Sequence, residues 1–141
     1  MPMKTDELTG TALDWAVAKC EGYTCLHKTE GRMPHEPQLV MWPPRKAYGL
    51  VELWELGYST DWSLAGPIIE REKLGVWWAT HYVDDDGVEY GNHWYAEPGC
   101  TDDNADKPYR VATGNTPLIA AMRGYVASKL GDEVELPEDI K

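Results

Sequence analysis

Residues 115–131 read Asn115-Thr116-Pro117-Leu118-Ile119-Ala120-Ala121-Met122-Arg123-Gly124-Tyr125-Val126-Ala127-Ser128-Lys129-Leu130-Gly131. This stretch predicts the most sharply bounded element of the chain, a helix that begins after Thr116 and ends at Gly131. The Thr116 hydroxyl can cap the helix, Pro117 suits the first helical position, and glycine commonly follows the last turn. The apolar residues form one stripe at helical spacing: Leu118, Ile119, Met122, Tyr125, Val126 and Leu130. We therefore expect this helix to pack on the core.

A second helix is predicted near the N-terminus, from Gly10 to Cys20. Thr9 offers a capping hydroxyl, and Gly22 lies just beyond the expected end. The apolar residues Leu13, Ala16, Val17 and Cys20 recur at helical spacing. The two helices therefore lie close to the two ends of the chain.

The region between the helices favours loops and short strands. Gly31 and four prolines interrupt residues 22–44, so we expect an extended loop there, with a short strand at residues 39–42. Residues 49–57 fit either a short strand or a single helical turn. Residues 76–83 and 88–96 are rich in β-forming side chains and flank the turn sequence Asp84-Asp85-Asp86-Gly87, which predicts a β-hairpin.

The remaining middle part predicts a surface loop at residues 97–108 and one more short strand at residues 109–112. With 141 residues and 15.9 kDa, the chain has the size of one domain spanning residues 1–141. There is no strand and helix alternation of the kind that builds a parallel sheet. We expect an α+β fold in which the N-terminal and C-terminal helices pack on a small antiparallel sheet with long loops.

The charge balance argues against nucleic acid as a partner. The chain has 24 acidic and 13 basic residues, a net charge of -11, whereas binding to a duplex relies on neutralising many phosphates. Acids concentrate at residues 84–86, at residues 102–106 and in the tail from residue 132, either as solvated turns or as a surface that imitates nucleic acid. No apolar run is long enough to span a membrane, and the acidic N-terminus does not look like a secretory signal. We expect a cytoplasmic protein.

The sequence contains no recognisable catalytic motif. A P-loop, a GxGxxG turn, a GxSxG elbow and an HExxH helix are all missing, so we assign no catalytic residue and expect no enzyme activity. Three cysteines without a signal peptide fit reduced thiols. The nearest approach to a metal site, Cys20, Cys25 and His27, lacks the usual paired spacing. We therefore expect neither a metal ion nor a cofactor.

The aromatic residues are unusual, with seven Trp, eight Tyr and no Phe, so that every ring carries an N–H or O–H. Such rings occur in cores, but they are also enriched in ligand pockets and at subunit interfaces. The sequence leaves these alternatives open.

Residues 58–71 combine the groups that hold a small polar ligand. They include two aromatic rings, three Ser and Thr hydroxyls, the Asp61 carboxylate and an Ala-Gly-Pro sequence that we read as a flexible turn. The rings can stack on a base, and the hydroxyls and carboxylate can bind ribose or phosphate. An alternative is a capped turn in which Asp61 or Ser59 bonds to nearby backbone and Trp62 fills the core.

This segment, together with residues 8–18 and 116–123, resembles the NinX family of small proteins from lambdoid phages. The resemblance covers the N-terminal helix, residues 58–71 and the last helix through residue 134. Residues 21–54 and 80–112 match less well. Where family members often show two glycines before the proline, this chain has Ala65-Gly66, and Gly124 stands where a larger residue is expected.

The resemblance implies a phage accessory protein of unknown function in the host bacterial cytoplasm. Accessory proteins of this size commonly counter host defences, and by analogy this one would sequester a nucleotide signal, such as a cyclic dinucleotide or a cyclic ADP-ribose derivative, without turnover. We expect a homo-oligomer, because so small a chain has little room to enclose such a ligand. The expected ligand-binding residues are Tyr58, Ser59, Thr60, Asp61, Trp62, Gly66, Arg71, Arg110 and Arg123.

Within that set, Tyr58 and Trp62 would stack on a base, and an arginine among Arg71, Arg110 and Arg123 would neutralise the ligand. Two other functions stay open. The first is an acidic protein-binding inhibitor or DNA mimic that acts on a host protein through the acidic clusters. The second is a phosphodiesterase or deaminase, which would require metal ligands that the sequence does not supply.

Overall fold

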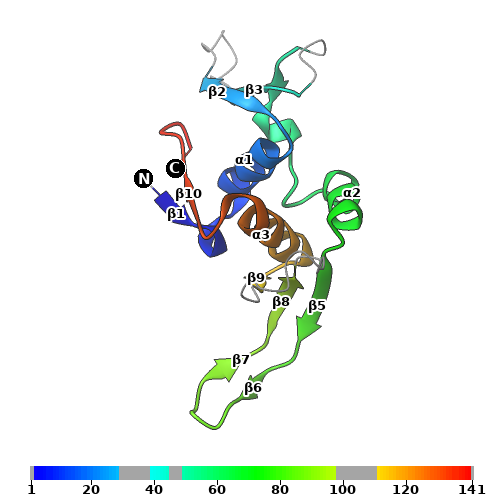
Figure 1. The fold of residues 1–141 in the computed structure, drawn as a ribbon, viewed down its shortest axis with the longest axis vertical. Coiled ribbons are helices and arrows are strands. Elements are labelled where there is room, and N and C mark those ends of the chain that lie inside the picture. Colours follow the sequence, from blue (N-terminus) through cyan, green and yellow to red (C-terminus); the bar gives the residue numbers. More distant parts are fainter. Residues whose placement is uncertain (1, 29–38, 45–48, 98–110, 141) are drawn as a thin grey trace, which may run out of the picture.

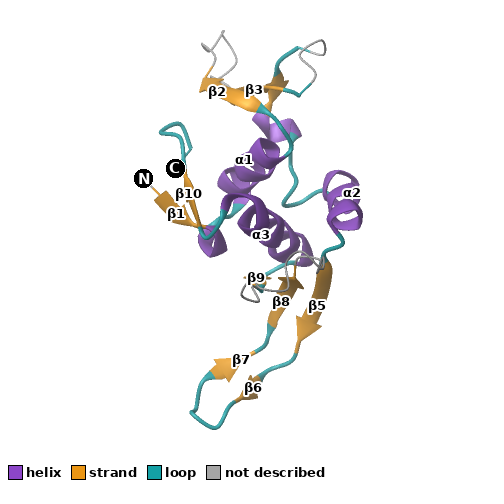
Figure 2. Ribbon diagram, viewed as in Figure 1, coloured by secondary structure: helices purple, strands orange, loops and turns teal. Residues whose placement is uncertain are grey.

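The computed structural model describes residues 2–28, 39–44, 49–97 and 111–140. Three helices meet in the middle of the molecule: α1 (Gly10–Cys20), α2 (Trp62–Glu72) and α3 (Pro117–Leu130) (Figure 1). Short antiparallel strands surround them, so the predicted α+β class is confirmed (Figure 2). No helix in the described part of the chain is both long and apolar enough to cross a membrane.

The strands form four separate small sheets in the described residues, where the sequence led us to expect one. The first sheet joins the two ends of the chain through β1 (Pro2–Lys4) and β10 (Glu133–Glu135), and the second contains β2 (Thr24–Lys28), β3 (Leu39–Trp42) and β4 (Val51–Glu52). The third has the order β5-β8-β9, and the fourth pairs β6 with β7. Their bounds are Gly75–Ala79 for β5, Tyr82–Val83 for β6, Glu89–Tyr90 for β7, His93–Glu97 for β8 and Ala112–Gly114 for β9.

The predicted β-hairpin is confirmed and forms an arm that projects from the body of the molecule (Figure 1). We call residues 75–97 the arm. It bends between its two strand pairs, where Gly91 adopts a positive φ of 94°. A Cβ atom on Gly91 would lie 2.0 Å from the Thr80 carbonyl oxygen, so only glycine fits at this bend.

The central helix α3 is confirmed with the expected boundaries. The Thr116 hydroxyl accepts a hydrogen bond from the Ile119 amide at 3.1 Å, and Gly131 follows the last turn. The helix is buried on more than one stripe, because β8 and β9 lie on one side of it and α1 on another. Small side chains allow this close packing: Ala96, Ala112, Ala120, Ala121 and Gly124.

The helix α1 also has its expected boundaries, but its predicted cap is wrong. Thr9 has the extended backbone of an N-cap residue, yet its hydroxyl makes no capping hydrogen bond. The described residues include two 3-10 turns beside the helices, η1 (Thr5–Glu7) and η3 (Leu53–Glu55). For residues 49–57 the sequence left a short strand and a single helical turn open. The structure contains both, because β4 is followed directly by η3.

Two elements differ from the sequence predictions. The prediction of a flexible Ala-Gly-Pro turn is wrong, because Pro67 lies inside α2. The Asp61 cap and the burial of Ala65 and Ile68 stabilise a helix that proline alone would disfavour. The strand β2 occupies part of the expected loop, since it pairs with the predicted strand β3. The rest of that loop at residues 29–38, most of the loop at residues 97–108 and the start of the strand at residues 109–112 lie outside the described residues.

We predict that two glycines at the contact of α3 with β8 and β9, Gly114 and Gly124, respond in opposite ways to alanine. A Cβ on Gly114 would lie 2.6 Å from the backbone nitrogen of Ala120, so Gly114→Ala should lower the free energy of unfolding by about 1–3 kcal/mol. A Cβ on Gly124 would meet Ala96 at an ordinary 3.5 Å, so Gly124→Ala should raise it by up to ~1 kcal/mol through helix propensity. Urea denaturation followed by circular dichroism measures both, and equal losses would contradict the packing described.

Candidate functional site

Residues 58–71 are linked to α1 through a partly buried hydrogen bond. The Ser59 amide donates to Asp14 Oδ1 on α1 at 2.8 Å, and Ser59 itself is buried. Burial raises the pKa of the Asp14 carboxyl, and the hydrogen bond from the Ser59 amide offsets part of that rise. Ser59 therefore joins the two segments, with its backbone facing the protein interior.

Tyr58 belongs to the hydrophobic core. Its side chain is only 6% exposed, and burial, together with the neighbouring Tyr23, raises the pKa of its hydroxyl. Little of its ring is left for a ligand to contact. The geometry therefore differs from the expectation that Tyr58 stacks on a base.

Arg71 occupies the junction of the three helices. Its Nη2 atom donates to both carboxylate oxygens of Glu21, at 3.1 and 2.9 Å, and to the Tyr125 hydroxyl at 3.1 Å. Its Nε atom donates to Glu72 at 3.3 Å, and the guanidinium lies 5.8 Å from the centroid of the Tyr125 ring. The bonds to Glu21 raise the pKa of Arg71, so its positive charge is already balanced within the chain.

Arg123 is likewise engaged in the fold. Its Nε atom donates to the Leu8 carbonyl at 2.8 Å and its Nη1 atom to the Thr113 carbonyl at 2.7 Å. Burial lowers the pKa of Arg123. These bonds connect α3 to the start of α1 and to β9. Arg110, the third candidate, lies outside the described residues.

The residues that follow Ser59 face solvent at the start of α2. Thr60 is exposed, and Asp61 is the N-cap residue, whose Oδ1 accepts from the Ser63 amide at 2.9 Å and from the Ser63 hydroxyl at 2.6 Å. These two bonds lower the pKa of the Asp61 carboxyl. Trp62 is 55% exposed, so it does not fill the core as the alternative interpretation required. The capping part of that interpretation holds for Asp61.

The structure therefore divides the predicted site. Tyr58 and Ser59 point into the protein, whereas Thr60, Asp61 and Trp62 form an outward-facing group. Gly66 lies half-buried in the middle of α2. Trp62 and Arg71 are nine positions apart on α2, which separates their backbones by about 13 Å along the helix axis. Within one chain, the described members of the predicted set do not line a single pocket.

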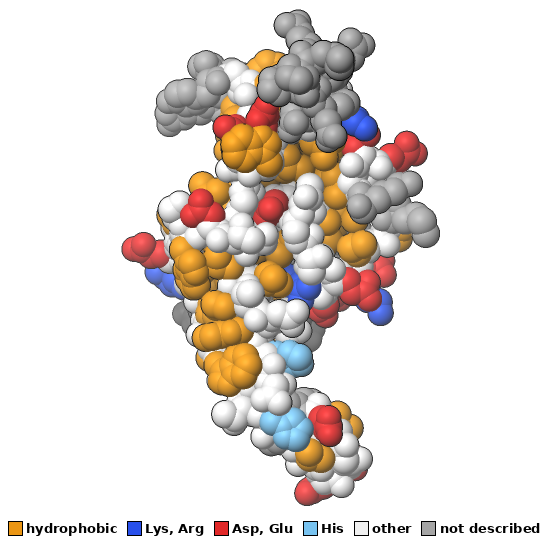
Figure 3. Space-filling view, turned by 180° about the vertical axis from the view of Figure 1, so that it is seen from behind, with side chains coloured by type: hydrophobic (Ala, Val, Ile, Leu, Met, Phe, Trp, Pro, Cys, Tyr) orange, Lys and Arg blue, Asp and Glu red, His pale blue; other side chains and the backbone are white. Residues whose placement is uncertain are grey.

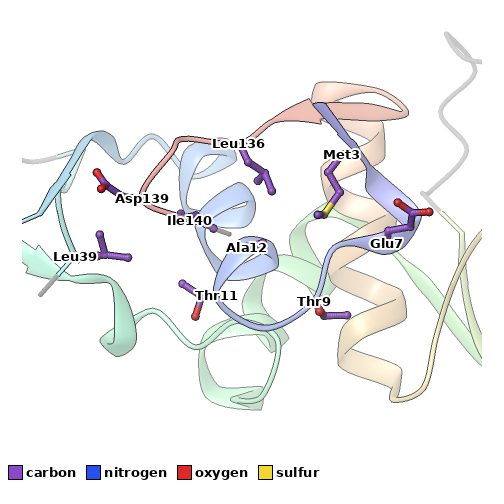
Figure 4. Close-up of a pocket in the computed structure, with 9 residues that line it drawn as sticks. All are labelled: Met3, Glu7, Thr9, Thr11, Ala12, Leu39, Leu136, Asp139 and Ile140. Carbon is purple, nitrogen blue, oxygen red and sulfur yellow. The ribbon is translucent and has the colours of Figure 1, made fainter. Parts of the chain in front are cut away.

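A cavity of about 410 Å³ lies elsewhere, between the start of α1, the β1–β10 pair and the first residue of β3 (Figure 4). Its polar lining comes from the carboxylates of Glu7 and Asp139 and the hydroxyls of Thr9 and Thr11, and its other side chains are apolar. Among the described residues no Lys or Arg lines it, so it is poorly suited to an anionic ligand. The sequence analysis missed it because its walls combine both ends of the chain.

Metal and thiol chemistry have little support in the described residues. No group of three or more His, Cys, Asp or Glu side chains comes together there. Cys20 is half-buried, and burial raises the pKa of its thiol to about 11, so the thiol is protonated at neutral pH. The side chains of Cys25, His27 and Cys100 lie outside the described part.

These features define a small α+β domain with a three-helix centre, a projecting hairpin arm and an exposed tryptophan at the start of its second helix. The family model described as Bacteriophage P22, NinX matches residues 4–129. The chain belongs to the NinX family of phage proteins, as its sequence predicts. No curated protein matches it significantly.

We predict that removing the charge of Asp14 stabilises the protein at neutral pH. Because burial raises the pKa of this carboxyl above 3.8, ionised Asp14 opposes folding once the pH exceeds that raised value. Asp14→Asn retains an acceptor for the Ser59 amide and should be more stable than the wild type at pH 7. This advantage should shrink as the pH falls through the raised pKa, since the wild-type carboxyl then becomes neutral too.

Asp14→Ala provides the contrast, because it leaves the buried Ser59 amide without its acceptor. It should lower the free energy of unfolding by about 1–3 kcal/mol at pH 7. Urea denaturation of the three proteins between pH 4 and 7, values chosen as roughly bracketing a raised carboxyl pKa, measures both effects. A wild type more stable than Asp14→Asn at pH 7 would contradict the assignment.

Proposed function

We propose that this protein is a non-catalytic phage accessory protein that binds a nucleotide-type signal, such as a cyclic dinucleotide or a cyclic ADP-ribose derivative, and holds it without turnover. It would act in the host bacterial cytoplasm and counter a host defence. The observation that carries the proposal is Trp62, an indole left 55% exposed at the first position of α2. It lies inside one of the segments that resemble the family.

The chemistry around Trp62 suits the base and sugar of a nucleotide. An exposed indole offers a flat face on which a base can stack. The neighbouring Asp61 carboxylate has a lowered pKa, so it stays anionic at neutral pH and can accept hydrogen bonds from ribose hydroxyls or an exocyclic amine. Thr60 adds an exposed hydroxyl beside it.

The phosphates of such a ligand need positive charge from another source. Arg71 is balanced by Glu21 and Glu72, and Arg123 is bonded to two carbonyls. Arg110 or a second copy of the chain would therefore supply the counter-charge at Trp62. This need is the physical reason to propose a homo-oligomer as the binding form.

The first experiment is mass spectrometry of small molecules released by heating protein purified from cells that express bacterial nucleotide-signalling enzymes. Wild type should release one intact nucleotide in stoichiometric amount. Trp62→Ala should bind that nucleotide about 5- to 150-fold more weakly in calorimetry, because stacking on one base is worth about 1–3 kcal/mol. Trp54→Ala is the matched control, since Trp54 is 69% exposed but lies on η3, outside the motif. Equal binding by both variants would contradict the role of Trp62.

Asp61 allows folding and binding to be separated. Asn is as good an N-cap as Asp, so Asp61→Asn should leave thermal stability unchanged while it weakens ligand binding through the lost charge. Asp61→Ala should also lower the free energy of unfolding by ~1 kcal/mol. If Asp61→Asn binds the released nucleotide as the wild type does, Asp61 is only a cap.

The end of the arm supports a second candidate function, a protein-binding inhibitor or DNA mimic. The turn between β6 and β7 carries three consecutive aspartates and lies far from the body (Figure 1). Asp84 shapes this turn, because its Oδ1 accepts from the amides of Asp86 and Val88 at 3.0 and 2.9 Å. The side chains of Asp85 and Asp86 are exposed, so they are accessible to a partner.

For this candidate, the variant Asp85→Asn, Asp86→Asn removes two charges and keeps Asp84. It should reduce capture of a basic host protein without changing the circular dichroism spectrum. Unchanged capture would exclude the arm tip as the contact surface.

A further inference from the structure

The cavity between the start of α1 and the β1–β10 pair has a carboxylate at each of two opposite ends. Figure 4 places Asp139 and Leu39 at one end and Glu7 at the other, with the first turn of α1 between them. Both acidic residues are exposed, so a ligand can reach them from solvent. The volume of about 410 Å³ lies within the range of roughly 300–1,000 Å³ that is typical of small-molecule sites. The cavity is therefore large enough for a small organic ligand.

The polar side chains of this cavity are available to bind a ligand. Within the part of the chain that the structure describes, no hydrogen bond or ion pair engages the side chains of Glu7, Thr9, Thr11 or Asp139. An ionised carboxylate can only accept hydrogen bonds, and a hydroxyl can also accept one. An ammonium group carries three donors and a positive charge, which makes it the complement of this lining. The polar groups therefore select a cation that donates hydrogen bonds.

The remaining lining of the cavity is apolar and consists of Met3, Ala12, Leu39, Leu136 and Ile140. Leu136 and Ile140 are buried, so they form a hydrocarbon floor. Methylene groups gain free energy when they leave water for such a surface, whereas an ammonium group loses its hydration there. The N-terminus of α1 carries partial positive charge, which also disfavours a cation in the middle of the cavity. A ligand with a positive charge at each end and hydrocarbon between them fits this pattern.

We infer that this cavity binds a linear aliphatic diamine, with one ammonium group at Glu7, the other at Asp139 and the methylene chain on the apolar floor. The net charge of -11 attracts cations to the whole protein, and acidic side chains are spread over the face shown in Figure 3. Selectivity comes instead from the separation of the two carboxylates, which only a diamine of matching length can span. The cavity shares no residue with the group around Trp62, so this inference stands apart from the proposed nucleotide binding.

Calorimetry with linear diaminoalkanes, from diaminobutane to diaminodecane, tests the site at about 0.15 M salt, which screens the general field of the protein. One molecule should bind per chain, and the affinity should pass through a maximum at one chain length. At that length the diamine should bind about fivefold more tightly than the amino alcohol of the same length, which carries a single ammonium group. No binding, an affinity without such a maximum, or equal binding of the diamine and the amino alcohol would overturn the inference.

Two conservative variants test the two ends of the cavity. Glu7→Gln and Asp139→Asn should each reduce the preference for the diamine over the amino alcohol to about twofold or less, because one ion pair is lost. Asp85→Asn is the matched control, since it removes the same charge from an exposed residue at the tip of the arm. It should retain the full preference. A preference that survives both cavity variants, or that Asp85→Asn abolishes as well, would show that the general field alone binds the ligand.

A lysine introduced into the cavity provides an independent test. Thr11→Lys should weaken binding of the preferred diamine about tenfold or more, because the new ammonium group repels the ligand and competes for the carboxylates. Thr80→Lys adds the same charge at an exposed position of the arm and should change the affinity by about twofold or less. Both threonines are exposed, so the circular dichroism spectra should match that of the wild type. Equal effects of the two lysines would overturn the assignment of the ligand to this cavity.

Discussion

The rest of the structure depends on how closely α3 lies against β8 and β9. A Cβ atom added to Gly114 would lie only 2.6 Å from the backbone nitrogen of Ala120, and Gly124 faces the methyl groups of Ala96 and Ala112. Small residues at this contact let the helix backbone approach the sheet directly, which is where dispersion contacts are densest. Because α3 also touches α1, α2 and β10, this one contact positions both ends of the chain and the base of the arm.

Polar links between distant segments complete this arrangement and also restrict what the protein can bind. Arg71 ties α2 to Glu21 and Tyr125, and Arg123 ties α3 to the carbonyls of Leu8 and Thr113. Both arginines of the described residues are thus engaged in holding the three family-like segments together. Under the proposed function, the counter-charge for an anionic ligand would therefore come from Arg110 or from a second copy of the chain.

The sequence predicted a candidate site at residues 58–71, but it did not predict which of these residues face solvent. The Ala65-Gly66-Pro67 sequence reads as a flexible turn, yet the Asp61 cap and the burial of Ala65 and Ile68 make a helix there. Which of the two aromatic rings faces solvent was not predictable, since Tyr58 is buried in a core shared with residues distant in the sequence, and Tyr23 and Tyr125 are among its neighbours.

By itself, the sequence determined the α+β class, the bounds of α1 and α3, the hairpin and the membership of the NinX family. These rest on signals that act within a few residues, such as the Thr116-Pro117 cap, the apolar stripe and the turn at residues 84–87. Only the tertiary structure decided that the strands form four sheets, that Trp62 is exposed while Tyr58 is not, and that Arg71 and Arg123 serve the fold. The exposure of a side chain and the pairing of a strand depend on which distant segments come into contact. Local sequence propensity contains no information about those contacts.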